Sequence, residues 1–207
     1  MIKAEQSSIH KWLMHKFVDY KLKQRFSNVN FYFDEKTTKL DKSILLIGNH
    51  VSWWDGFIGW HINRVVFKKQ YHVMMLEDQL QKFWFFRKCG AFSINPGNKS
   101  VVKSLRYSAE LLSNRDNMVQ FYPQGKLHSL YEHQFEFNKG LDFILKNCPD
   151  TQVIFFAFIP EYAANEKPYI SIFIEYFDTI GNNNSIQEAY HQFFSKSLQK
   201  HISMFSE

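Results

Sequence analysis

The chain has 207 residues, of which 45% are hydrophobic, 22% are charged and 18% are aromatic, with 22 phenylalanines. This size allows one domain with a substantial core, and the aromatic content indicates a large apolar cavity, a membrane-facing patch or both. No apolar run approaches the roughly 18 residues that a membrane span needs, and the N-terminus lacks the apolar run and cleavage site of a signal peptide. We therefore expect a cytoplasmic protein that is peripheral to the inner face of the membrane.

The formal net charge of +5 favours anionic partners, which include phosphate-bearing ligands, acidic lipid and nucleic acid. The sequence contains no recognised RNA- or DNA-binding motif, and its basic residues are scattered beyond the first helix. We therefore expect no nucleic-acid partner. Cys89 and Cys148 lie far apart in a chain without an export signal, so we expect two reduced structural thiols.

Residues 7–26 have the pattern of a basic amphipathic helix that begins at Ser7 or Ser8. Such a helix can lie in a lipid interface or pack on its own domain, and the pattern leaves both interpretations open. The apolar positions at helical spacing are Ile9, Trp12, Leu13, Phe17, Tyr20 and Leu22, and the basic positions are Lys11, Lys16, Lys21, Lys23 and Arg25.

Strands and helices alternate through the rest of the chain, which predicts an α/β fold with a largely parallel or mixed sheet flanked by helices. The continuously apolar run at 44–47 is typical of a strand buried on both faces. No linker or repeat interrupts the pattern, so we expect a single domain over 29–207 after an N-terminal helix within 1–28. The expected strands are 30–33, 43–48, 71–76, 118–122, 152–158 and 169–175, and the expected helices are 55–67, 78–87, 99–113, 137–147 and 185–204.

The segment Gly48-Asn49-His50-Val51-Ser52-Trp53-Trp54-Asp55-Gly56 carries the strongest chemical signal, because it joins a buried strand to a helix. Across such a turn Asp55 can accept a hydrogen bond from the His50 imidazole, which would fix its tautomer and stabilise the ring after it takes a proton. With no convincing Ser or Cys nucleophile nearby, the pattern favours direct attack by a second substrate that His50 deprotonates. The alternative interpretation is a helix N-cap at Asp55 and a loop histidine at His50.

A second turn, Tyr122-Pro123-Gln124-Gly125-Lys126, follows the apolar strand that ends near residue 121. Its backbone N–H groups can face a phosphate or a developing oxyanion, although the same residues also make an ordinary tight turn.

The two segments, in this order and spacing, resemble conserved blocks of the glycerolipid acyltransferase family, which includes the lysophosphatidic acid acyltransferases. The Asn-His-x4-Asp block matches Asn49, His50 and Asp55, and the Phe-Pro-Glu-Gly-Thr-Arg-Ser block partly matches 122–128. The Gly-x-x-Phe-Ile-x-Arg block is approached by Gly90-Ala91-Phe92-Ser93-Ile94-Asn95-Pro96, and Phe137-Asn138-Lys139-Gly140 resembles a Phe-Lys-x-Gly segment that often follows.

The resemblance implies an acyltransferase with an apolar channel and a membrane-facing surface, with acyl-CoA or acyl carrier protein as the donor, a lipid-like acceptor, and no metal or bound cofactor. It assigns His50 as general base and Asp55 as its orienting partner. The substrate-binding residues expected from the matched blocks are Asn49, Gly90, Tyr122, Pro123, Gln124, Gly125, Lys126 and Lys139.

The sequence also departs from the family pattern at positions that matter for the acceptor. Pro96 and Leu127 replace two arginines, which removes the bidentate grip on a phosphate, and Gln124 replaces a glutamate. Lysines at 99, 103, 126 and 139 can restore charge but not that geometry, so we expect a less anionic acceptor such as a glycolipid, a pigment-linked sugar, a lipoamino acid or another lysolipid. The same departures support an alternative function, a non-catalytic lipid- or acyl-carrier-binding protein.

Overall fold

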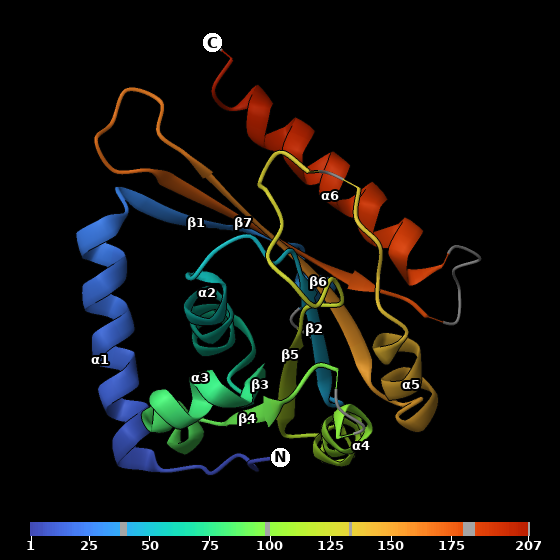
Figure 1. The fold of residues 1–207 in the computed structure, drawn as a ribbon. Helices are drawn as coiled ribbons and strands as arrows, with labels where there is room; N and C mark the ends of the chain where they lie inside the picture. The colour runs from blue at the N-terminus through green and yellow to red at the C-terminus, as the bar shows by residue number, and fades with distance from the viewer. Residues whose placement is uncertain (38–40, 98–99, 133, 180–184, 207) are drawn as a thin grey trace.

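Seven strands form one sheet in the computed structural model, which describes residues 1–37, 41–97, 100–132, 134–179 and 185–206 (Figure 1). Neighbouring strands are parallel except β6 and β7, which are antiparallel, so the predicted mixed sheet is confirmed. The strands, in spatial order, are β1 (Asn28–Tyr32), β7 (Tyr169–Phe177), β6 (Gln152–Glu161), β2 (Ile44–Gly48), β5 (Asn117–Phe121), β3 (Gln70–Leu76) and β4 (Ala91–Ile94).

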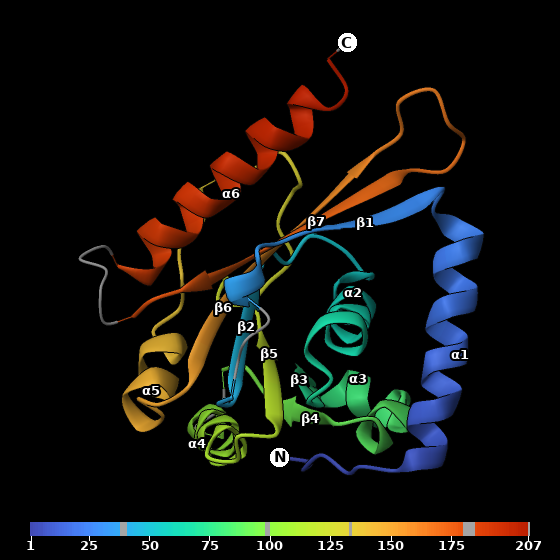
Figure 2. The same cartoon turned by 180° about the vertical axis from the view of Figure 1, so that it is seen from behind.

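Helices cover both faces of this sheet, as Figures 1 and 2 show from opposite sides. One face of the sheet packs on α1 and α2, and the opposite face packs on α4, α5 and α6. The helices are α1 (Ser8–Arg25), α2 (Asp55–Ile62), α3 (Glu77–Lys82), α4 (Val101–Leu112), α5 (Gly140–Asn147) and α6 (Ile186–Ser203).

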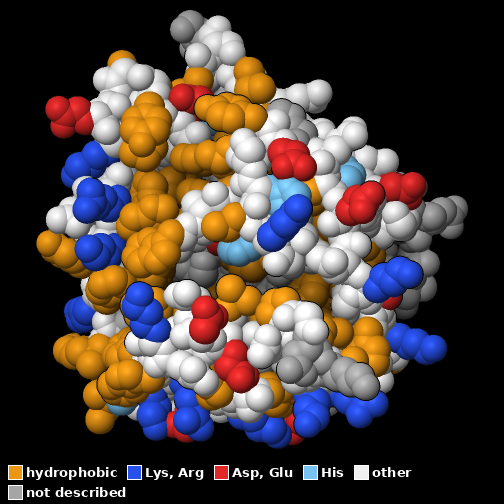
Figure 3. Space-filling model, viewed as in Figure 1, with side chains coloured by type: hydrophobic (Ala, Val, Ile, Leu, Met, Phe, Trp, Pro, Cys, Tyr) orange, Lys and Arg blue, Asp and Glu red, His pale blue; other side chains and the backbone are white. Residues whose placement is uncertain are grey.

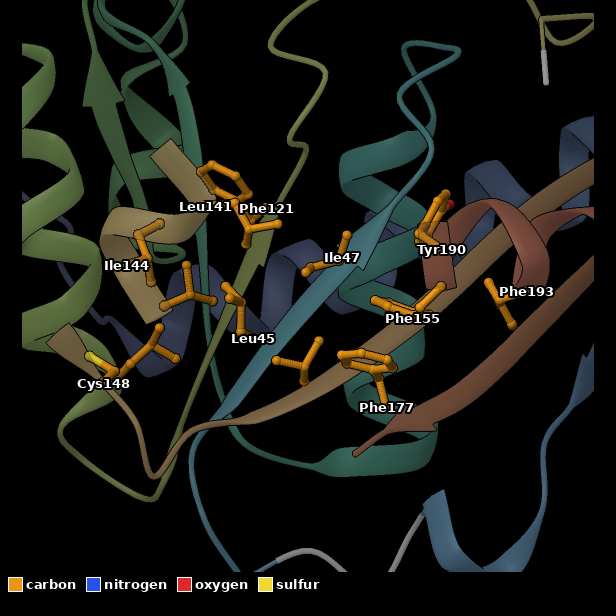
Figure 4. Close-up of a cluster of buried hydrophobic side chains, with 14 of the residues drawn as sticks. Leu45, Ile47, Phe121, Leu141, Ile144, Cys148, Phe155, Phe177, Tyr190 and Phe193 are labelled. Atoms are coloured by element: carbon orange, nitrogen blue, oxygen red, sulfur yellow. The ribbon is translucent and has the colours of Figure 1, made fainter. Parts of the chain in front are cut away.

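Strand β2 lies at the centre of the core, and its side chains alternate between the two faces. Ile44 and Leu46 pack toward α1 and α2, whereas Leu45 and Ile47 pack toward α4, α5 and α6. All four side chains have 0% exposure, which confirms the prediction of a strand covered on both faces. Figure 4 shows Leu45 and Ile47 within the hydrophobic cluster on the side of α4, α5 and α6. A strand this deeply buried gives the loop that follows it a rigid base.

Four differences between the predicted elements and the structure have a physical reason. Strand β4 was not predicted, because four residues are too short to show a clear period. The predicted helix 78–87 is two pieces, α3 and the 3-10 turn Trp84–Lys88, separated by the non-helical backbone of Phe83. The predicted helix 55–67 ends as an α-helix at Ile62 and continues as a π-helical turn, Asn63–Phe67. The predicted helix 137–147 begins only at Gly140, because Asn138 hydrogen-bonds the turn that follows β5.

Helix α1 packs on its own domain through a narrow face formed by Met14, Val18 and Leu22. An ion pair between Asp19 and Arg64, in the π-helical turn, fixes it from the side. The broad apolar stripe predicted for this helix mostly faces outward, since Ile9, Trp12, Leu13, Phe17 and Tyr20 are exposed. Among the described residues, no helix combines the length and the apolar character needed to cross a bilayer.

Candidate active site

The loop after β2 brings His50 and Asp55 together at the start of α2. Nδ1 of His50 lies 2.8 Å from Oδ2 of Asp55, whose side chain is only 1% exposed. The same Oδ2 accepts the backbone N–H groups of Val51 (2.7 Å) and Ser52 (3.0 Å), and the Ser52 hydroxyl donates to Oδ1 (2.8 Å). These bonds hold the carboxylate in one orientation. Because the carboxylate accepts the Nδ1 proton, Nε2 of His50 is left as the basic nitrogen.

The turn after β5 holds the backbone of His50 from both sides. The Gln124 side chain accepts the His50 N–H through Oε1 (2.7 Å), and the His128 N–H donates to the His50 carbonyl (2.8 Å). Gln124 is buried, and its Nε2 has no hydrogen-bond partner within the described part of the chain. The departure from glutamate therefore keeps an acceptor for His50 and adds a buried donor beside it.

The ring of Tyr122 stacks on the imidazole of His50, with a centroid distance of 4.4 Å and an angle of 19° between the planes. Burial of its hydroxyl raises the pKa of Tyr122 well above the usual value, so the side chain is neutral. Tyr122 thus limits the rotation of the imidazole, while Asp55 fixes its edge.

Gln120, on β5, connects these two contacts. Its Nε2 donates to the backbone carbonyl of Asp55 (3.1 Å) and to the Tyr122 hydroxyl, and its Oε1 accepts from the Tyr71 hydroxyl. Gln120 is completely buried and lies against Gly59 of α2, where any Cβ would overlap its amide. Gln120 is not among the residues predicted from the sequence, although a polar residue between Val119 and Phe121 in an apolar strand is a usable signal.

The turn Pro123-Gln124-Gly125 and the segment before α5 form one structure. Asn138 donates its side-chain N–H groups to the carbonyls of Pro123 (3.0 Å) and Gln124 (2.9 Å), and Gly125 adopts a φ of +71°. A Cβ on Gly125 would lie 2.7 Å from the Asn138 amide nitrogen, so glycine is required there for two reasons. The structure therefore brings together two of the segments that carry the resemblance, and Lys126 and Lys139, one from each, are exposed.

Asn49 and Gly90, both predicted to bind substrate, make contacts within the fold, and their part in substrate binding stays a prediction. The Asn49 side chain is 1% exposed and exchanges two hydrogen bonds with the backbone of Phe158 (3.1 and 3.2 Å), which ties the end of β2 to β6. Gly90 precedes β4 with a φ of +100°, and a Cβ there would overlap the carbonyl of Tyr71. Since β4 is three strands from β2, Gly90 is separated from the strand that carries His50 by about 14 Å.

Neither thiol is in this site. Cys89 and Cys148 are both buried and free, and burial raises the pKa of both, that of Cys89 to about 12. Of the residues that might replace the lost arginines, Lys99 lies outside the described residues and Lys103 is exposed on α4. No group of three or more His, Cys, Asp or Glu side chains in the described ranges could hold a metal ion.

A model of the acyltransferase family matches residues 28–160, a range that contains both strand-end loops. The chain belongs to the acyltransferase family. A 1-acyl-sn-glycerol-3-phosphate acyltransferase of Streptococcus pneumoniae (strain ATCC BAA-255 / R6) is 26% identical over 105 residues, which cover 49% of this chain but only 38% of that relative.

The fold is also that of a glycerolipid-type acyltransferase. The crystal structure of the 1-acyl-sn-glycerophosphate (LPA) acyltransferase PlsC from Thermotoga maritima superposes with a TM-score of 0.60 over 94% of this chain and 79% of that chain, at 15% sequence identity. The fold class predicted from the sequence and the resemblance to the acyltransferase family are therefore confirmed.

Proposed function

We propose that this protein transfers a fatty acyl group from a thioester donor, acyl-CoA or acyl carrier protein, to a hydroxyl or amine of a lipid-like acceptor. The 2.8 Å contact between His50 and Asp55 carries this proposal, because it leaves Nε2 of His50 as an oriented basic nitrogen just after the end of β2. The His50 side chain is 30% exposed, so a substrate can reach it, whereas Asp55 is shielded. A general base of this kind contributes about 100-fold or more to such a reaction.

The proposed reaction needs one base and no covalent enzyme intermediate. His50 Nε2 takes the proton of the acceptor O–H or N–H while the acceptor atom attacks the thioester carbonyl carbon. The tetrahedral intermediate then collapses, the carbon–sulfur bond breaks, and the thiolate leaves with the proton from the imidazolium. Asp55 stabilises the imidazolium while it exists.

The roles of the Ser52 hydroxyl and of the two thiols support direct attack by the acceptor on the thioester. The hydroxyl of Ser52 donates to Asp55 and accepts the Trp54 N–H (3.1 Å), so it serves as a brace for the loop. Both thiols are buried and have a raised pKa, which makes them poor nucleophiles. The free Nε2 of Gln124 is a buried donor near the reacting group, and such donors stabilise the oxyanion of a tetrahedral intermediate.

We further propose that α1 holds the enzyme on a membrane surface. The exposed apolar side chains of α1 continue through ring contacts of Phe17 with Phe57 and of Phe57 with Trp53, which is 63% exposed. Figure 3 shows hydrophobic side chains gathered on the left of the molecule, where Figure 1 places α1, with basic side chains among them. An apolar band with a basic border favours an anionic lipid interface. The band ends within the loop that carries His50, which would place a lipid acceptor near the base.

The test is thioester consumption by the purified protein against a panel of lysolipid, glycolipid and lipoamino acid acceptors, with His50→Ala as the control. We expect thiol release that an acceptor stimulates and that the mutant lacks. Equal release by the mutant would exclude His50 as the base. Binding of the donor without turnover of any acceptor would favour the non-catalytic alternative.

A further inference from the structure

A cleft of about 660 Å³ opens beside the loop that carries His50. Three separate parts of the chain form it: the C-terminal end of α1, the Trp53–Trp54 pair of the loop, and the hairpin between β6 and β7. Figures 1 and 2 both show this hairpin beside the junction of α1 and β1, and the Ser27 N–H donates to the Pro168 carbonyl (3.0 Å) there. The lining residues are Lys21, Gln24, Arg25, Phe26, Trp53, Trp54, Tyr162, Glu166, Lys167 and Pro168.

The charge of this lining is predominantly positive. Lys21, Arg25 and Lys167 face one carboxylate, Glu166, and none of the three cations takes part in an ion pair found among the described residues. The C-terminal end of a helix favours cations, which accounts for Arg25 alone. Lys167 comes from the hairpin, so the dipole of α1 does not explain why it lines the same cleft as Arg25.

Aromatic rings form the walls. Phe26 is buried and meets Trp54 edge to face at 4.8 Å, and Trp54 meets Trp53 at 5.2 Å. Trp53 and Tyr162 are 63% and 59% exposed, so two wide rings stand open to solvent above a fixed floor. Open aromatic faces next to cations that make no ion pair with a described residue suit a ligand that combines a planar ring with phosphate groups.

We propose that this cleft binds the phosphate-bearing end of the acyl donor, an inference that rests on the proposed acyl transfer. Pro96 and Leu127 stand where the family pattern has two arginines, so these two positions offer no guanidinium group to a phosphate. The cleft supplies cations on the side of Trp53, three residues from His50. A donor seated there by its phosphates would extend its thioester along the loop toward the imidazole.

The experiment measures binding separately from turnover, so that it also reports on a protein that shows no acyl transfer. Three probes are titrated by calorimetry into the full chain: adenosine 3′,5′-bisphosphate for the nucleotide end of a donor, glycerol 3-phosphate for an acceptor headgroup, and inorganic phosphate. The variant is Arg25→Gln/Lys167→Gln. The matched control is Lys146→Gln, which removes a charge from α5 on the other face of the sheet.

We expect adenosine 3′,5′-bisphosphate to bind more tightly than inorganic phosphate and to lose about 10-fold in affinity in the double variant but not in the control. With acyl-CoA as substrate, KM should rise by about the same factor while kcat is unchanged. Equal binding by the variant and the parent chain, or no binding above inorganic phosphate, would overturn the proposal. Dependence on Arg25 and Lys167 for glycerol 3-phosphate alone would assign the cleft to the acceptor and overturn the donor assignment.

Discussion

The imidazole of His50 lies nearly flat on the ring of Tyr122, with 4.4 Å between their centroids. The contact joins the end of β2 to the end of β5, two neighbouring strands with parallel register. It places one face of the imidazole against a neutral ring, while Asp55 holds Nδ1. The orientation of the imidazole is therefore set by two strand ends and the start of α2 together.

Replacing Asp55 by asparagine should lower kcat by at least about 100-fold, because the neutral amide can no longer stabilise the imidazolium. The measurement is the rate of acceptor-dependent thiol release under saturating donor. The variant should keep its fold, since an amide oxygen can still accept the Val51 and Ser52 N–H groups. A kcat close to that of the parent would show that the contact with His50 is not used in catalysis.

Gly59→Ala should displace the Gln120 amide. This would weaken the hydrogen bonds by which Gln120 holds Asp55 and Tyr122, the two residues that orient the His50 imidazole. We expect the free energy of unfolding to fall by about 2 kcal/mol, because buried polar groups lose their partners, and we expect kcat to fall as well. Gln120→Ala makes room for the new methyl group, so the double variant should be more stable than the sum of the single effects predicts. Strict additivity in a double-mutant cycle, measured by urea unfolding, would show that Gly59 and Gln120 are not packed as described.

Gln124 offers a test of what the family's glutamate position does in this chain. Gln124→Glu retains an oxygen for the His50 N–H but removes the buried donor, whereas Gln124→Leu removes both. We expect the leucine variant to lose about 2 kcal/mol of stability and most of its activity, because the His50 N–H is left unpaired. We expect the glutamate variant to fold with reduced stability, because it buries a carboxylate oxygen that has no donor, and to lose activity through kcat. Full activity in the glutamate variant would exclude Nε2 as an oxyanion donor.

His72 should make the fold sensitive to acid. Burial lowers the pKa of this histidine to about 4, below its ordinary value near 6.5. The unfolded chain therefore binds a proton first as the pH falls, so stability is full above about pH 6.5 and is lost between there and pH 4. We expect His72 to account for about 2 kcal/mol of the loss between pH 7.5 and pH 5. In His72→Phe, urea unfolding at the two pH values should show a loss smaller by that amount; an unchanged loss would contradict the assignment.

Trp12→Ser/Phe17→Ser should weaken binding to vesicles without changing the fold, because both side chains are exposed on α1. Burying an exposed apolar side chain in lipid contributes about 1 to 2 kcal/mol, so the pair should reduce partitioning at least about 10-fold. The measurement is co-sedimentation with vesicles that contain anionic lipid. Leu127→Ser, an exposed apolar residue outside the band, serves as the control. Equal partitioning of the parent and the double variant would exclude α1 as the membrane contact.

The sequence alone predicts the fold class, which the structure confirms, and it proposes His50 and Asp55 as the catalytic pair. The apolar run at 44–47 and the alternation of strands and helices predict a mixed α/β sheet, because a strand that is covered on both faces is apolar at every position. His50 and Asp55 could be found because both lie in one short loop, where five residues of separation limit the possible geometries. The resemblance to the acyltransferase family rested on the same local blocks.

The surroundings of His50 and Asp55 follow from the folded chain alone. Gln120 meets Asp55 across 65 positions of sequence, and Lys167 lines the same cleft as Arg25, so neither relation leaves a local pattern. The tertiary structure also shows that the Asn49 side chain hydrogen-bonds the backbone of β6, and that the Tyr71 carbonyl lies where a Cβ on Gly90 would stand. Contacts between distant segments depend on strand order and on which side chains the core excludes from water. A single sequence gives the residues that take part in such contacts, but which of them meet depends on the folded chain.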